Sequence, residues 1–149
     1  DGRQFDKGPF FTFDIPHVRR LAAALWTSVT TSMDGQHMLV STAGSLILLL
    51  DAFEGNLQQA GVGDVGIGSG VDARLSPDGR WVVSGSEDGA LRVWDAAEGN
   101  LAAMLPAPGQ EEGKQVRRVC FSPRFETMAT AGSSTALWIA PLPDGPDGQ

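Results

Sequence analysis

The fold of this chain is decided by residues 71–105, which read VDARLSPDGRWVVSGSEDGALRVWDAAEGNLAAML. Val71–Leu75 alternates apolar and polar side chains, as a half-buried β-strand does. Ser76-Pro77-Asp78-Gly79 follows as a turn, because proline fixes φ and glycine permits a positive φ. Similar alternation and similar turns recur to the end of the stretch. Four consecutive antiparallel strands are therefore expected: Val71–Leu75, Trp81–Ser84, Leu91–Trp94 and Leu101–Leu105.

This unit is repeated along the chain. Ser32-Met33-Asp34-Gly35 lies 44 residues before Ser76-Pro77-Asp78-Gly79, and Glu54-Gly55-Asn56-Leu57 lies 44 residues before Glu98-Gly99-Asn100-Leu101. A third copy opens at Ser122-Pro123-Arg124-Phe125. A period of about 40–45 residues with four strands in each unit is the period of β-propeller blades. The sequence therefore predicts an all-β fold, a partial β-propeller of about three blades plus one orphan strand.

The expected boundaries follow from these copies. The opening Asp1-Gly2-Arg3-Gln4 has no initiating Met and no apolar signal segment, which suggests a fragment. Arg19–Trp26 is expected to be either a short helical turn or an extended connection. Residues 61–70 and 107–113 are expected to be loops between blades. The predicted units are an outer strand (Pro9–Phe13) with its connection in residues 1–25, blades at 26–60 and 70–105, a last blade at 116–140 without an outer strand, and a disordered tail at 141–149.

Composition and charge narrow the function classes. Hydrophobic residues make up 42% of the 149 residues, which is enough for a core, whereas the aliphatic run Leu46–Leu50 is far shorter than the roughly 20 residues of a membrane helix. A membrane span is therefore not expected. The net charge of −7 repels phosphate, so direct nucleic-acid binding is not expected either. Cys120 is the single cysteine, which excludes an internal disulfide, and it is expected to be a buried small hydrophobe.

The sequence contains few residues that are suited to catalysis. The loop from Gly61 to Gly66 matches a dinucleotide-binding fingerprint, but that motif needs a following helix to hold the pyrophosphate, and a strand is expected next. His17 and His37 are the only histidines, and His37 is expected to be solvated beside an Asp-Gly turn. No catalytic, cofactor or metal site is therefore expected. A small nucleotide-binding enzyme is the alternative from another class, and a helix after Gly66 would favour it.

Two arginine doublets stand out against the acidic background. Arg19-Arg20 and Arg117-Arg118 are each expected in a connection that precedes an inner strand, on one face of the propeller. They are either solvated loop charges or a cluster for an acidic or phosphorylated partner segment, because guanidinium groups match carboxylate and phosphate geometry. The four arginines are the candidate partner-binding residues.

Several stretches resemble the WD-repeat family, over residues 5 to about 142. The resemblance is to the C-terminal half of family members that are propeller subunits of COMPASS-type histone lysine methyltransferase complexes. The family's propeller is a closed ring, so an open arc of three blades is expected to be marginally stable alone. The stretches that carry the resemblance are Phe5-Asp6-Lys7-Gly8-Pro9-Phe10, Ser41-Thr42-Ala43-Gly44-Ser45, Asp51-Ala52-Phe53-Glu54-Gly55, Gly85-Ser86-Glu87-Asp88-Gly89, Phe121-Ser122-Pro123-Arg124-Phe125 and Trp138.

The resemblance implies a noncatalytic nuclear scaffold that links a methyltransferase complex to transcribing RNA polymerase II. The partners it implies are a histone lysine methyltransferase subunit, the phosphorylated RNA polymerase II tail, and a nuclear phosphatase or 3′-end-processing complex. A generic WD-repeat adaptor, such as a ubiquitin-ligase substrate receptor, is the alternative. The resemblance also implies a structural network in which Ser84, Asp88 and Trp94 are three members of the WD-repeat tetrad, whose histidine is missing from this sequence.

Overall fold

The computed structural model describes residues 12, 25–43, 46–60, 72–106 and 115–139. Within these ranges every regular element is a β-strand, and no helix there is long and apolar enough to cross a membrane. The eleven strands are β1 (Trp26–Thr31), β2 (His37–Thr42), β3 (Ile47–Asp51), β4 (Leu57–Ala60), β5 (Ala73–Leu75), β6 (Trp81–Ser84), β7 (Ala90–Asp95), β8 (Leu101–Pro106), β9 (Val116–Phe121), β10 (Thr127–Gly132) and β11 (Thr135–Ile139).

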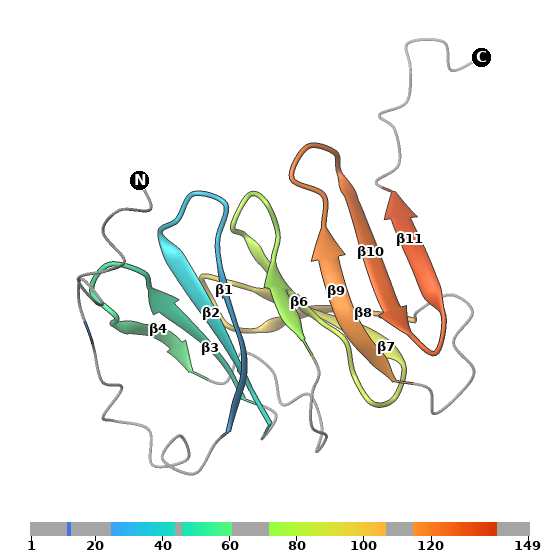
Figure 1. Cartoon of the computed structure of the whole chain (residues 1–149), viewed down its shortest axis with the longest axis horizontal. Helices are drawn as coiled ribbons and strands as arrows, with labels where there is room; N and C mark the ends of the chain where they lie inside the picture. Colours follow the sequence, from blue (N-terminus) through green and yellow to red (C-terminus); the bar gives the residue numbers. More distant parts are fainter. Residues whose placement is uncertain (1–11, 13–24, 44–45, 61–71, 107–114, 140–149) are drawn as a thin grey trace, which may run out of the picture.

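The strands form three antiparallel sheets that stand side by side in chain order (Figure 1). The first blade has the order β1-β2-β3-β4 and the second β5-β6-β7-β8, whereas the described part of the third blade has the order β11-β10-β9. Each sheet is an up-and-down meander, because every strand pairs with its neighbour in sequence. The predicted all-β class and the three sheets of a partial propeller are confirmed.

The 44-residue repeat returns as a repeat of turn hydrogen bonds. The His37 N–H donates to Ser32 Oγ and the Trp81 N–H donates to Ser76 Oγ, both at 2.9 Å. Gly35 and Gly79 hold the same turn position with φ of 72° and 73°, in the left-handed region that favours glycine. Identical local chemistry thus builds the same turn in the first two blades.

Two buried clusters join the blades. The first brings together Leu39, Ile47 and Leu49 of the first blade with apolar residues of the second, including Trp94 at 3% exposure. The second joins Val83 and Leu91 to Val116 and Val119. Burial of these aliphatic and aromatic side chains is the main stabilising term between blades. A third cluster, of Val40, Leu48 and Leu50, lies within the first blade.

Three sequence-based expectations are wrong. Cys120 is exposed, because alternation along β9 turns it away from the buried Val119. His37 is half-buried rather than solvated, and its Nδ1 has no hydrogen-bond partner within the described residues. The strand expected from Val71 begins only at Ala73.

Other expectations fall on residues that lie outside the described ranges. They are the outer strand at Pro9–Phe13, the connection at Arg19–Trp26, the loops at 61–70 and 107–113, and the tail at 141–149.

Candidate functional site

Arg117 and Arg118 lie inside β9, the edge strand of the third sheet, and both side chains are exposed. The sequence analysis had them in the connection before this strand, and that placement is wrong. The strand starts earlier because Val116 is buried between the blades and opens the ladder. The register shifts between Ala131 and Gly132, so that Arg117 is bulged out of the pairing. The bulge accounts for two adjacent arginines both facing solvent.

Backbone contacts join the start of β9 to the second blade. The Asp72 N–H donates to the Arg117 carbonyl oxygen at 3.1 Å, and the Val116 N–H donates to the Ser86 carbonyl oxygen at 3.1 Å. The Gln115 side-chain amide donates to Glu87 Oε1 at 2.8 Å. The arginine pair is therefore carried by a strand that is tied to its neighbouring blade, which orients the site.

Arg74 is a third arginine beside this pair. Its Nε donates to the Val119 carbonyl oxygen at 3.3 Å, and its Nη2 lies 2.8 Å from Asp72 Oδ2. Because Asp72 is only 2% exposed, this ion pair lies where little water can reach the carboxylate, and the Asp72 and Arg74 charges neutralise each other there. The sequence analysis missed Arg74, although the alternation from Val71 to Leu75 had marked it as a polar strand position.

Arg19 and Arg20 lie outside the described residues. The structure therefore does not place them against Arg117 and Arg118, and whether the two doublets form one cluster stays a prediction.

The three residues of the expected WD network are in the second blade, where Ser84 and Trp94 are buried. Ser84 Oγ donates to the Gly85 carbonyl oxygen at 2.8 Å. Asp88 accepts the Ala90 N–H at 2.9 Å and the Arg92 Nη2 at 2.8 Å. Partial burial opposes ionisation of Asp88, but the Ala90 bond and the Ser86 and Arg92 side chains outweigh it and hold its pKa below the usual value.

The equivalent position in the third blade makes a direct Trp–Thr contact. Trp138 Nε1 donates to Thr130 Oγ1 at 3.0 Å, and Thr130 is 1% exposed. Met128 pairs with Trp138 in the ladder as Val82 pairs with Trp94, which gives Thr130 the place of Ser84. Thr130 was missed in the sequence, although it lies at the same offset from Ser84 as Ser122 from Ser76.

No group of three His, Cys, Asp or Glu side chains that could hold a metal ion occurs in the part of the chain that the structure describes. The fingerprint loop from Gly61 to Gly66 lies outside that part, and the first element described after it is the strand β5. Exposed arginines and exposed apolar side chains are the features that point to function here, and both suit protein contacts.

Three sheets built on repeated turns define a segment of a WD-repeat propeller, and the family model "WD domain, G-beta repeat" matches residues 62–95. The chain belongs to the WD-repeat family, whose domains mediate protein–protein interactions. It is 37% identical over 146 residues to "WD repeat-containing protein 82" of Drosophila melanogaster, covering 97% of this chain and 44% of that protein.

Two further relatives are similar over most of this chain. "Protein ANTHESIS POMOTING FACTOR 1" of Arabidopsis thaliana is 36% identical over 139 residues, which cover 93% of this chain and 40% of that protein. "WD repeat domain-containing protein 83" of Homo sapiens is 34% identical over 123 residues, which cover 82% of this chain and 38% of that protein. The chain spans less than half the length of these curated relatives, so the activity of a whole protein does not transfer to it directly.

Proposed function

We propose that the chain is part of a noncatalytic nuclear scaffold subunit that joins a COMPASS-type histone lysine methyltransferase complex to transcribing RNA polymerase II. The observation that carries the proposal is the 37% identity to WD repeat-containing protein 82 over 97% of the chain.

Arg117 and Arg118 are the proposed contact for an acidic or phosphorylated partner segment, with Arg19 and Arg20 as a second doublet. The first pair is exposed on an edge strand, and Arg74 nearby is already paired with Asp72. A guanidinium can bind a carboxylate or phosphate bidentately. Each such contact is worth about 1.5–3 kcal/mol when it is desolvated, and little at a wet rim.

The test is affinity purification of the protein that carries this chain, from nuclear extract, followed by mass spectrometry. The proposal expects a methyltransferase subunit and RNA polymerase II with a phosphorylated tail among the recovered proteins. A nuclear phosphatase or 3′-end-processing complex is also consistent with it. Recovery of ubiquitin-ligase subunits instead would favour the generic adaptor and contradict the proposal.

Charge reversal tests the arginine assignment separately. Arg117→Glu with Arg118→Glu, and Arg19→Glu with Arg20→Glu, are compared with Arg124→Glu, an exposed arginine in a turn after β9. Loss of partners by either double variant but not by Arg124→Glu supports the site. If both double variants fold and retain every partner at the wild-type level, the arginines are solvated charges only.

A further inference from the structure

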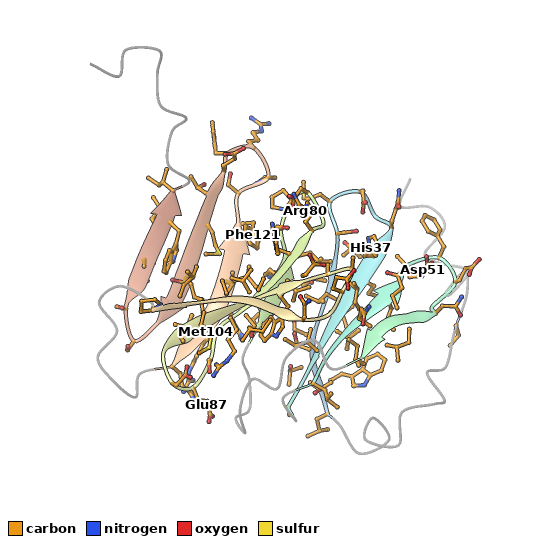
Figure 2. All side chains as sticks on the ribbon, turned by 180° about the vertical axis from the view of Figure 1, so that it is seen from behind. His37, Asp51, Arg80, Glu87, Met104 and Phe121 are labelled. Atoms are coloured by element: carbon orange, nitrogen blue, oxygen red, sulfur yellow. The ribbon has the colours of Figure 1, made fainter. Side chains whose placement is uncertain are left out.

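An aromatic groove opens between the second and third blades, at the end of β9 opposite to the arginine pair. It has a volume of about 650 Å³. Figure 2 shows Phe121 and Arg80 at this end of the two neighbouring blades, and Glu87 at the other. Side chains from both blades line the groove: Trp81, Leu105, Phe121, Phe125, Met128 and Trp138.

The lining is accessible to a partner. Phe125 is 72% exposed at the rim, and Trp81, Phe121 and Trp138 are half-buried. Exposed aromatic surface of this kind costs solvation free energy unless something covers it, and concave aromatic sites are frequent points of recognition. A ligand can therefore contact several ring faces in one place.

The charges at the rim favour a cation. Asp78 and Glu126 contribute two carboxylates to the lining, against one guanidinium from Arg124. The Ser76 hydroxyl, which donates to Asp78 Oδ1, lowers the pKa of Asp78, so this carboxylate is ionised at neutral pH. The residues that line the groove therefore carry one more carboxylate than guanidinium, around aromatic rings whose faces are negative as well.

The structure contains an example of the contact that such a site would make. The Arg80 guanidinium carbon lies 5.2 Å from the centroid of the Trp81 ring, which is a cation–π contact. A guanidinium is flat and weakly hydrated, so it can stack on a ring while its N–H groups reach a carboxylate. An ammonium group holds its water more tightly and cannot stack.

We infer that the aromatic groove binds an arginine side chain presented by a basic segment of a partner protein. The guanidinium stacks on the tryptophan and phenylalanine rings, and Asp78 and Glu126 neutralise it. Arg124, and Arg80 stacked on Trp81, oppose this binding as competing cations. The site is separate from the acidic-partner contact proposed for Arg117 and Arg118, so either can fail without the other.

The test uses the full chain and a heptapeptide of glycine and alanine with one central arginine. The same peptide with citrulline, the neutral isostere of arginine, and with lysine are the comparison probes. Binding is followed by NMR through the indole N–H signals. We expect the indole N–H signals of Trp81 and Trp138 to shift, while that of the exposed Trp26 in β1 does not. We expect the citrulline peptide to bind at least about 5-fold more weakly than the arginine peptide, and the lysine peptide to have an intermediate affinity.

Variants at the rim test the charge argument, and all the changed side chains are exposed, so only small effects on stability are expected. Asp78→Asn with Glu126→Gln should weaken arginine binding, whereas Arg124→Gln should strengthen it. Glu54→Gln, an exposed carboxylate in the first blade, is the matched control and should leave binding unchanged.

Several results would overturn the inference. Equal binding of the citrulline and arginine peptides would show that the groove is merely apolar. Weaker binding of the arginine peptide after Arg124→Gln would contradict the charge argument. Indole shifts confined to Trp26, or no indole shift at millimolar peptide, would show that the peptide does not bind in the groove.

Discussion

The two seams between blades are built from the same repeat but are sealed differently. The seam between the first and second blades buries eight apolar residues within the described ranges, and Trp94 is one of them. Among the described residues, the seam between the second and third blades buries four, and Phe121, Met128 and Trp138 are only partly covered. A shared sequence repeat thus produces the same strands and the same strand pairing, but it does not produce the same burial of the seams between blades.

The residues next to the two tryptophans differ in burial. After Trp94 the chain turns at Asp95, and the Ala96 N–H donates to the Arg80 carbonyl oxygen at 2.9 Å, which seats Ala96 in the seam at 6% exposure. After Trp138 comes Ile139, which ends β11 and is 67% exposed. In the seam between the first and second blades, the turn that follows the tryptophan therefore supplies a residue that helps to close the seam.

The largest expected effect is that of Trp94→Ala. It removes a fully packed indole from the closed seam and should cost about 3–5 kcal/mol of unfolding free energy in urea titration. Trp138→Ala, in the seam between the second and third blades, should cost clearly less because its side chain is already part exposed. Equal costs for the two would mean that the seams are equally sealed.

Gly85→Ala tests the seam between the second and third blades at the point where the two backbones are in contact. A Cβ at this position would lie 2.0 Å from the Val116 carbonyl oxygen, so the two backbones would have to separate. We expect a loss of about 1–3 kcal/mol, as for other overpacked sites, and faster hydrogen exchange of β9 amides. Unchanged stability would show that the blades move apart there at no cost.

Trp138→Phe tests the polar contact in the third blade. It removes the donor to Thr130 and leaves a buried hydroxyl without that partner, which should cost about 1–3 kcal/mol. Combining it with Thr130→Val in a double-mutant cycle isolates the bond from the loss of indole packing. A coupling free energy near zero would contradict the assigned role of the pair.

The smallest effect concerns pH and the turns. The pKa of Asp78 is lowered, mainly by the Ser76 hydroxyl, and the pKa of Asp34 is lowered, mainly by the Ser32 hydroxyl. A lowered folded-state pKa stabilises the fold above the ordinary carboxyl value near 3.8, and this stability is lost as the pH falls through the lowered pKa.

Asp78→Asn should therefore destabilise slightly at pH 7 and have almost no effect near pH 2, by urea titration at both values. Both carboxylates are solvent-exposed, which keeps the effect small. Arg124→Gln in the corresponding third-blade turn is the control and should show no such pH dependence. A larger loss at pH 2 than at pH 7 would contradict the assignment.

The sequence by itself determined the strands, the turns and their period. Turn chemistry such as Ser76-Pro77-Asp78-Gly79 and the alternation in Leu91–Trp94 act over a few residues, so they can be recognised without any neighbour. The expected strand at Trp81–Ser84 agrees with β6, and the opening of the third copy at Ser122 agrees with the turn after β9. The same local reasoning correctly predicted Trp94 as a member of its strand.

Only the tertiary structure decided which faces are covered. The bulge at Arg117, the exposure of Cys120 and the Trp138–Thr130 bond depend on how β9 and β10 pair and on which sheet lies beside them. The aromatic groove depends on two blades at once, since Trp81 and Phe121 are 40 residues apart in the chain. Alternation specifies that a strand has two faces, but burial is a property of the neighbouring sheet, and the periodicity of one strand carries no information about that neighbour.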